Sequence, residues 1–259
     1  MASNIVRLWT EEEKVGGSGS PYGTFQSCDP TMTYYPAENG RDRGTIIVCP
    51  GGGYEMKAGH EGEPIARWLN QMQINAYVLD YRIYPDLHPA PLMDVRRAIA
   101  LARQSAESLG TLSDHIGVLG FSAGGHLAAS AATMWDQKLN RPDAAVLCYP
   151  VISFEKYAHI GSRAKLLGDS ANQAMISDLS LENRVDRQTP PTFIWHTADD
   201  EVVPVENTIV FAQALASKKV PFSCHIFSSW PHGLGLAEDN KDVHNWLDLC
   251  RNFLELQGF

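Results

Sequence analysis

The 259-residue sequence lacks the features of a protein that binds nucleic acid, a membrane or a metal. Asp and Glu outnumber Lys and Arg by 30 to 21, which opposes polyphosphate binding because that requires clustered cations. No apolar run approaches the roughly 20 residues that a membrane helix needs. No histidines or cysteines are paired at metal-ligand spacing. We therefore expect a chain that uses no metal or organic cofactor and binds neither nucleic acid nor membrane.

The five cysteines are scattered, and no two form a Cys-x-x-Cys pair. Three of them stand in apolar runs, where a free thiol behaves as a small hydrophobic group. This pattern, together with an N-terminus that has no apolar leader, predicts a cytoplasmic protein. The length and the 44% hydrophobic content predict one domain, 1–259, with a full core. The oligomeric state is left open, a homo-oligomer included.

Short β-branched runs alternate with longer segments of helical period from residue 45 onward. Such alternation is typical of parallel strands joined by crossover helices. We expect strands at Thr45–Cys49, Ala76–Asp80, Ile116–Gly120, Ala145–Tyr149, Thr192–His196 and Ser223–Phe227, and helices at 63–73, 90–110, 205–220 and 240–256. The sequence therefore predicts the α/β class, with a mostly parallel central sheet and helices on both faces.

Three other segments depart from this rhythm. Residues 31–45 suggest a leading antiparallel strand and a turn at Asn39-Gly40, and residues 16–23 are expected to be loop. Residues 151–190 are too long for a plain connection in a compact domain. We expect this insert to form short helices that make a small cap or pocket wall.

Ser122 stands between two glycines in "GFSAG", where an apolar run gives way to small, helix-forming residues. The pattern matches G-x-S-x-G, a strand-to-helix elbow that exposes the serine Oγ at the top of a sheet. The motif alone is weak, because an ordinary glycine-rich turn has the same letters. The preceding strand and the following helix strengthen it, and we expect Ser122 to be a nucleophile.

A serine nucleophile needs a base, and the base needs a group that orients it. In enzymes built on this elbow, the acid and then the histidine follow the serine in the chain. Asp199 and Asp200 follow one predicted strand, and His232 follows the last one. His232 is therefore the expected base. The two aspartates point in different directions, so only one of them can meet the imidazole.

The stretch "CPGGGY" follows the first predicted parallel strand and can supply backbone donors for an oxyanion. We expect the N–H groups of Gly52 and Gly53 to converge with that of Ala123, next to the nucleophile. A phosphate cradle is the alternative for these glycines. No Lys-Ser/Thr follows at the spacing that a P-loop requires, which opposes that alternative.

With these residues placed, the sequence resembles the α/β-hydrolases of the esterase and lipase kind. Within that fold it is similar to the small carbohydrate acetyl esterases, often labelled acetylxylan esterase or endoxylanase-like. The resemblance lies between residues 45 and 237, in "CPGGGY", "LDYRIYPDLHPAPLMDVRRAI", "GFSAGGHLAA" and "WHTADDEVVPVENTIVFAQAL" with the later "PHGLGLA".

The resemblance also implies roles for single residues. The second stretch is similar to the D-Y-R-x-x-P segment of hormone-sensitive-lipase-like esterases, in which Arg82 and Asp94 would be structural. The acid segment resembles that of prolyl-oligopeptidase-like hydrolases, where the first aspartate is catalytic, and this favours Asp199. The chain departs from the H-G-G-G of lipase-like enzymes, because Pro50 replaces the histidine. Proline has no N–H, so the donors must come from the glycines.

The resemblance implies a serine carboxylesterase with a triad of Ser122, Asp199 and His232, whose partner is a small ester or acetylated saccharide. Acetylated sugars or xylo-oligosaccharides are the expected substrates. Trp230, Tyr54 and the 151–190 insert are candidates for the pocket wall. A peptidase or amidase with the same triad is the alternative. A binding protein that has lost catalysis is a third hypothesis, opposed by the three filled triad positions.

Overall fold

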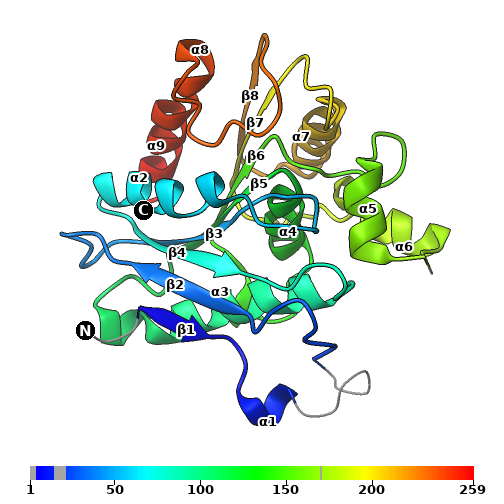
Figure 1. Ribbon diagram of the computed structural model, residues 1–259. Coiled ribbons are helices and arrows are strands. Elements are labelled where there is room, and N and C mark those ends of the chain that lie inside the picture. The colour runs from blue at the N-terminus through cyan, green and yellow to red at the C-terminus, as the bar shows by residue number, and fades with distance from the viewer. Residues whose placement is uncertain (1–3, 15–21, 170) are drawn as a thin grey trace.

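A computed structural model describes residues 4–14, 22–169 and 171–259 of the chain. An eight-stranded sheet forms its centre, in the order β1-β2-β4-β3-β5-β6-β7-β8 (Figure 1). The neighbours from β4 to β8 are parallel, whereas β1–β2 and β2–β4 are antiparallel. The strands are β1 (Ile5–Arg7), β2 (Thr31–Tyr35), β3 (Thr45–Cys49), β4 (Asn75–Asp80), β5 (Ile116–Phe121), β6 (Ala144–Cys148), β7 (Thr192–Thr197) and β8 (Phe222–Phe227). The predicted α/β class with a mostly parallel sheet is confirmed.

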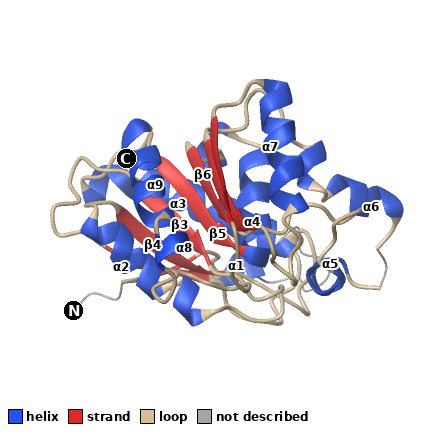
Figure 2. Cartoon of the chain, turned by 90° about the horizontal axis from the view of Figure 1, so that it is seen from above, coloured by secondary structure: helices blue, strands red, loops and turns tan. Residues whose placement is uncertain are grey.

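Helices cover both faces of this sheet. Side chains of α2 and α9 pack on one face, and those of α3, α4 and α7 pack on the other (Figures 1 and 2). The helical elements are α1 (Glu11–Lys14), η2 (Gly59–Glu61), α2 (Glu63–Gln71), α3 (Ala90–Leu109), α4 (Ser122–Thr133), η3 (Lys138–Asn140), α5 (Ile160–Leu167), α6 (Gln173–Asp178), η4 (Leu181–Asn183), α7 (Glu206–Lys218), α8 (Lys241–His244) and α9 (Trp246–Leu256).

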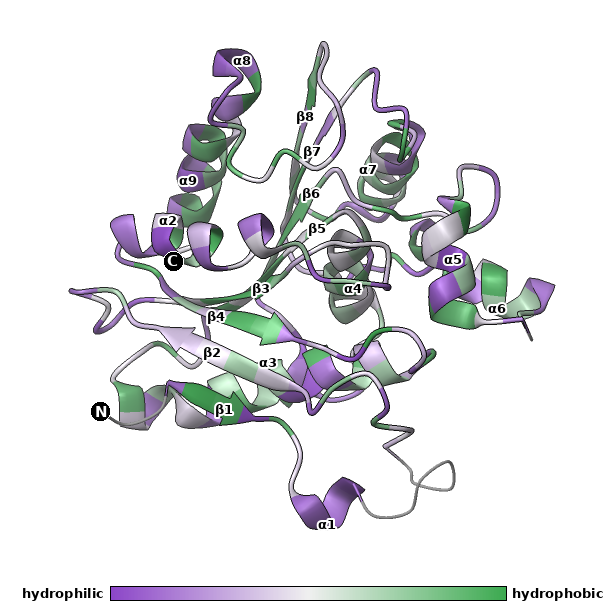
Figure 3. Ribbon diagram, viewed as in Figure 1, coloured by the Kyte–Doolittle hydropathy of each residue, from purple (hydrophilic) through white to green (hydrophobic). Residues whose placement is uncertain are grey.

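The central strands are hydrophobic on both sides because both faces of the sheet are covered. In β3, Ile46 and Val48 join the cluster under α2 and α9, while Ile47 and Cys49 join the cluster under α3 and α4. Figure 3 shows the same contrast, with hydrophobic strands at the centre and a hydrophilic α1 at the periphery. These two clusters are the hydrophobic core on which the ends of the strands are positioned.

The structure changes some of the predicted boundaries. The leading strand β2 pairs with β4, through Tyr35 and Ala76 at one end, and the chain then turns near Asn39 before it enters β3. β6 ends at Cys148, because Tyr149 has a φ of 37° and cannot continue a strand. The helix expected at 240–256 is divided into α8 and α9. Most of the loop expected at 16–23 lies outside the described residues.

The segment 151–190 folds into α5, α6 and η4, beside α4 and α7 (Figure 2). Its first residues are fastened to α7 by Asn207, whose Oδ1 accepts the N–H groups of Ile152 and Ser153, both at 2.9 Å. The Asn207 amide donates to the carbonyl of Tyr157 at 2.9 Å. A buried asparagine thus fixes where the insert leaves the sheet.

The C-terminal residue lies at the amino ends of the strands. The ring of Phe259 is buried, with its centroid 5.6 Å from that of His115, which precedes β5. It fills the space beside Gly44 and Gly117, where an added Cβ would lie 2.4 Å and 3.2 Å from ring atoms. The other end of β5 carries Ser122, so the C-terminus and Ser122 lie at opposite edges of the sheet.

Candidate active site

Ser122 occupies a sharp turn between β5 and α4. Its φ is 52°, a left-handed conformation that costs a non-glycine residue about 1–3 kcal/mol. A Cβ at Gly120 would lie 2.1 Å from the Gly124 carbonyl oxygen, and one at Gly124 would lie 2.1 Å from that of Cys49. The turn therefore requires both glycines of the motif, because Gly120 faces the backbone of the elbow itself and Gly124 is packed against the end of β3.

His232 connects Ser122 to an acid. Its Nε2 lies 2.7 Å from the Ser122 Oγ, and its Nδ1 lies 2.6 Å from the Oδ2 of Asp200. The imidazole belongs to the loop 228–240 between β8 and α8, hereafter the histidine loop, and Asp200 follows β7. The ring packs edge-on against Tyr149, with the centroids 5.0 Å apart. Residues 110 positions apart in the chain thus meet at the carboxyl edge of the sheet.

The expectation that Asp199 meets the imidazole is wrong. Asp199 is exposed, and its carboxylate accepts hydrogen bonds from the Ser229 hydroxyl at 2.5 Å and from the Trp230 N–H at 2.9 Å. These two hydrogen bonds lower the pKa of Asp199. Asp199 therefore braces the histidine loop from outside, and the next residue, turned inward, contacts the ring.

The inward turn of Asp200 has a local cause. Its Oδ1 accepts the N–H groups of Val202 and Val203, each at 2.9 Å, which closes a tight turn after β7. Its Oδ2 is left to face two imidazoles, His232 and the buried His196, whose Nε2 is 3.2 Å away. The sequence does not show which of the two aspartates turns inward. The turn follows the strand, and the pattern of apolar residues that predicts the strand does not extend into it.

The charge of Asp200 is strongly stabilised. Burial acts against the ionised form, but hydrogen bonds from His196, His232 and Val203 outweigh it, and the pKa of Asp200 lies well below its usual range. An ionised Asp200 accepts the Nδ1–H of His232. The Nε2 of that ring is then the atom without a proton, as a general base for Ser122 requires.

The oxyanion loop, residues 50–58 after β3, lies directly against Ser122. A Cβ added at Gly51 would lie 3.0 Å from the Ser122 Cβ. The N–H of Gly51 donates to Glu61 at 2.7 Å and is not free to bind an oxyanion. Within the described part of the chain, the N–H groups of Gly52, Gly53 and Ala123 have no hydrogen-bond acceptor. This pattern supports those three as the oxyanion donors.

Tyr54 does not line a pocket, contrary to one expectation. It is buried, and its hydroxyl lies 2.9 Å from the Nδ1 of His126. The Nε2 of His126 lies 2.9 Å from the Leu179 carbonyl oxygen, and burial lowers the pKa of this histidine to about 4. His126 is thus a neutral packing residue beneath the elbow. Trp230 is partly exposed and remains a candidate for the pocket wall.

Sequence analysis did not single out Glu61 and Tyr149. Glu61 is 2% exposed, and its Oε1 accepts the hydroxyl of Tyr149 at 2.7 Å. The signal in the sequence is faint: a charged residue between glycines in "GHEGEP", and a tyrosine directly after a buried strand. Neither position carries a motif, and only the fold brings them to the site.

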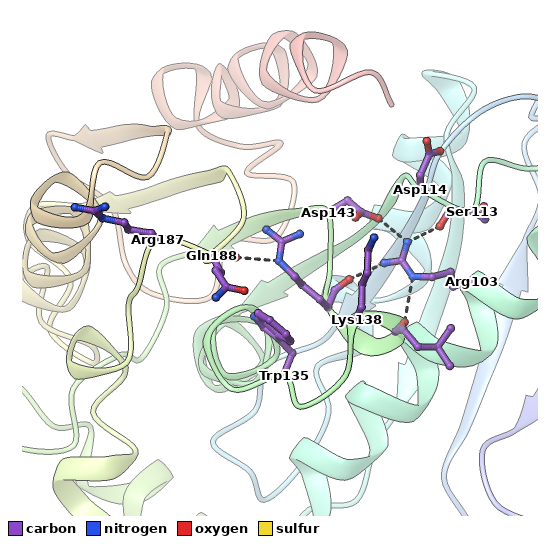
Figure 4. A pocket seen from close by; sticks show the side chains of 10 residues that line it. Arg103, Ser113, Asp114, Trp135, Lys138, Asp143, Arg187 and Gln188 are labelled. Atoms are coloured by element: carbon purple, nitrogen blue, oxygen red, sulfur yellow. Dashed lines mark hydrogen bonds and ion pairs between the residues drawn. The ribbon is translucent and has the colours of Figure 1, made fainter.

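A cavity of about 830 Å³ lies at the opposite edge of the sheet (Figure 4). Asp114 and Asp143, which precede β5 and β6, are among its lining residues. Arg103 crosses its wall and is held by the Asp143 carboxylate at 2.9 Å and by the carbonyl of Leu139 at 3.1 Å. Because Ser122 is at the other end of β5, we assign this cavity no part in the chemistry.

The residues that the structure describes contain no cluster of three or more His, Cys, Asp or Glu side chains that could hold a metal ion. None of the helices described is long and apolar enough to span a bilayer.

Comparison with known proteins places the chain in a family. The BD-FAE family model matches residues 32–215. Endo-1,4-beta-xylanase B of Butyrivibrio fibrisolvens is 38% identical over 246 residues, which cover 90% of this chain and 38% of that protein. The acetylxylan esterase of Xylanibacter ruminicola is 34% identical over 229 residues, or 83% of this chain and 47% of that protein. The chain thus spans less than half the length of these two relatives.

A solved structure agrees with this placement. The acetyl ester-xyloside bifunctional hydrolase from Caldicellulosiruptor lactoaceticus superposes with a TM-score of 0.92 and is 43% identical, covering 99% of this chain and 97% of its own. The carboxylesterase Cest-2923 from Lactobacillus plantarum superposes with a TM-score of 0.76 at 26% identity, over 88% and 92% of the two chains. The chain has the α/β-hydrolase fold and belongs to the BD-FAE family.

Proposed function

We propose that this chain is a serine carboxylesterase that hydrolyses short acyl esters and removes acetyl groups from acetylated xylose-based saccharides. The observation that carries the proposal is the continuous hydrogen-bonded path from Ser122 through His232 to Asp200, at 2.7 Å and 2.6 Å. The names of the acetylxylan esterase and of the acetyl ester-xyloside hydrolase to which the chain is similar support the choice of substrate.

The geometry supports a two-step acyl transfer. The Oγ of Ser122 attacks the ester carbonyl while its proton passes to the Nε2 of His232. The carbonyl oxygen becomes an oxyanion, which the N–H groups of Gly52, Gly53 and Ala123 would bind. The imidazolium gives its proton to the leaving alcohol, and the acyl-enzyme remains. Water, deprotonated by the same Nε2, then releases the acid and restores Ser122.

Ionised Asp200 has two roles in this sequence. It holds the imidazole in the tautomer that can accept a proton at Nε2, and it stabilises the imidazolium that forms in each half-reaction. The low pKa of Asp200 keeps this carboxylate charged throughout the neutral range. The chain's own groups thus supply the nucleophile, the base and the oxyanion donors.

We also propose that the 151–190 insert forms a wall of the substrate pocket. His159 caps α5 by accepting the Ser162 N–H at Nδ1, at 3.2 Å. Burial, and to a smaller extent the positive charge of His232 when that ring is protonated, lowers the pKa of His159, so the insert brings a neutral imidazole near the site. Replacing His159 by Ala is expected to raise KM more than it lowers kcat, measured on an acetylated xyloside.

The hydrolase from Caldicellulosiruptor lactoaceticus is named for xylosides as well as for acetyl esters. A glycosidase needs two carboxyl groups free to flank the sugar bond. The two buried carboxylates described beside Ser122 are both engaged, Asp200 with His232 and Glu61 with the Gly51 N–H. We therefore propose ester hydrolysis for this chain, and 4-nitrophenyl xyloside serves as the comparison substrate.

The decisive experiment compares wild type with Ser122→Ala on 4-nitrophenyl acetate, 4-nitrophenyl xyloside, acetylated xylo-oligosaccharides and a prolyl amide. Released acetate, 4-nitrophenol and amine are measured in parallel. The proposal requires acetate release by wild type and loss of all but a small residue of it in the variant. Faster amide cleavage than ester cleavage would instead favour the peptidase alternative. Mass analysis after treatment with a fluorophosphonate should find the added mass on Ser122.

The cellular compartment and the oligomeric state of the chain remain predictions. All five cysteines are free thiols, which supports a reducing compartment such as the cytoplasm. A homo-oligomer is tested by light scattering during size-exclusion chromatography.

A further inference from the structure

Glu61 is a buried carboxylate to which the proposed mechanism assigns no role. It is the last residue of η2, ten positions after Gly51, and is 2% exposed. Its Oε2 accepts the Gly51 N–H at 2.7 Å, and its Oε1 accepts the Tyr149 O–H at 2.7 Å. Both oxygens are therefore engaged, one of them with the oxyanion loop.

Tyr149 extends this contact to the histidine loop. Its hydroxyl oxygen accepts the N–H of Gly235 at 2.8 Å while its proton goes to Glu61. Its N–H donates to the Trp195 carbonyl at 2.7 Å, so the residue is fixed between the ends of β6 and β7. Its ring packs edge-on against His232. One phenol thus joins the carboxylate to the loop that carries the base.

The neighbour of Glu61 contacts the same loop on its outer side. The Nε2 of His60 lies 2.9 Å from the Gly233 carbonyl oxygen and donates its proton to it. A Cβ at Gly235 would lie 3.0 Å from the His60 ring, so the loop and η2 are in van der Waals contact. η2 therefore contacts Gly233 and Gly235, the two neighbours of Leu234 in the part of the histidine loop that follows His232.

The oxyanion loop is held in one orientation by contacts at successive peptides. The Pro50 carbonyl accepts the Tyr81 hydroxyl at 2.6 Å, and the next N–H, that of Gly51, goes to Glu61. The Gly51 and Gly52 carbonyls accept N–H groups from residues 55, 56 and 58. With these groups engaged, the N–H groups of Gly52 and Gly53 are left to face a ligand.

A charged side chain is costly at such a position. Burial raises the pKa of Glu61, and the hydrogen bonds from Tyr149 and Gly51 act in the opposite direction. The Nε2 of the largely exposed His60 is 3.8 Å from the Glu61 carboxylate, which is too far for a hydrogen bond. An apolar side chain of the same size would avoid this cost, so a purely packing role does not explain the carboxylate.

We propose that the carboxylate of Glu61 is a positioning group that fixes the oxyanion loop and the histidine loop relative to Ser122. The inference rests on the proposed esterase function, because it assigns Glu61 a role in that site. It acts through other groups and does not touch the substrate. Its loss should therefore impair the transition state, in which the oxyanion donors and the base must act together, more than substrate binding.

Three variants test this, Glu61→Gln, Glu61→Ala and Tyr149→Phe, together with the double variant Glu61→Gln/Tyr149→Phe. In Glu61→Gln the amide oxygen can still accept the Gly51 N–H, but the amide NH₂ then meets Tyr149 and cannot accept its proton. Asn75→Ala is the matched control. Asn75 is also buried and holds three backbone groups, but at the amino end of β4, away from Ser122.

On 4-nitrophenyl acetate we expect Glu61→Ala to lower kcat by about 10²-fold with little change in KM, because one oxyanion-hole contact is worth that much or more. Glu61→Gln and Tyr149→Phe should each lower kcat by about tenfold. Because both break the same contact, the double variant should lose much less than the product of the two single losses. The inhibition constant of an aryl trifluoromethyl ketone, which adds to Ser122 as an oxyanion, should rise in step with the loss in kcat/KM.

Thermal unfolding separates positioning from stability. Asn75→Ala should lower Tm while keeping wild-type kcat at 20 °C. If folded Glu61→Gln or Tyr149→Phe also keeps wild-type kcat and ketone affinity, the positioning role is wrong. If Glu61→Ala does not fold, Glu61→Gln and Tyr149→Phe still decide the question. An inactive wild type, or one whose Ser122 is not labelled by the fluorophosphonate, would instead refute the esterase function itself.

Discussion

Replacing Asp200 by Asn should remove most of the activity, whereas the same change at Asp199 should not. The amide oxygen of an Asn at 200 is needed by the N–H groups of Val202 and Val203, both 2.9 Å from Oδ1. Its NH₂ then takes the place of Oδ2, 2.6 Å from the Nδ1 of His232. An NH₂ donates where a carboxylate accepts. The imidazole must then place its own proton on Nε2, where it cannot accept one from Ser122.

The size of the expected loss in kcat follows from this wrong tautomer. In Ser-His-Asp enzymes the equivalent change lowers kcat by about 10⁴-fold, or about 5 kcal/mol of transition-state stabilisation. At Asp199 the change is on the surface, and an Asn there still accepts the Trp230 N–H. Its effect on kcat should stay within about twofold.

The assay is kcat and KM for 4-nitrophenyl acetate, with fluorophosphonate titration of the active fraction to exclude wild-type contamination. Circular dichroism verifies that both variants are folded. A folded Asp200→Asn protein within tenfold of wild-type kcat, or a larger loss at Asp199 than at Asp200, would refute the assignment of the acid.

Three further predictions concern stability. Gly124→Ala should cost about 3 kcal/mol or more of unfolding free energy in urea, because its methyl group would lie 2.1 Å from the Cys49 carbonyl oxygen; a cost below about 1 kcal/mol would contradict this packing. His126 is neutral when folded, with its pKa lowered to about 4, so the unfolded state takes up a proton first and stability falls, on the order of 3 kcal/mol, between about pH 6.5 and 4. In urea titrations of His126→Asn this fall should be smaller by about that amount, because the half-buried His88, whose pKa is also lowered to about 4, still contributes; an unchanged pH dependence would contradict the buried neutral ring. Asp94→Ala leaves the buried Arg82 guanidinium without its carboxylate 2.7 Å away and should cost about 3–5 kcal/mol, with kcat at 20 °C retained.

The alternation of strands and helices could be predicted because it has a simple physical cause. A strand covered on both faces must be apolar throughout, and β3 and β5 are fully buried. Ser122 could be predicted because the elbow requires glycines at fixed distances from it. His232 followed from its place after the last strand. In each case the local chain determines the structure.

Other features depend on contacts that the local chain does not determine. β2 pairs with β4 and not with β3, the next strand in the chain, a choice made by the antiparallel ladder from Thr31 to Tyr35. The choice between Asp199 and Asp200 depends on which carboxylate the following backbone captures. Glu61 gains its significance from Tyr149, 88 residues later. The spacing of apolar residues in the sequence carries no information about a partner so far along the chain.

The burial of Phe259 at the amino edge of the sheet has a practical consequence. A linker that continues from Phe259 would leave the molecule on the side away from Ser122. Attachment to a resin or a sensor chip through such a linker would leave the edge that carries Ser122 directed toward the bulk solution. A polymeric saccharide too large to enter the gap beneath a tethered molecule could then still reach it.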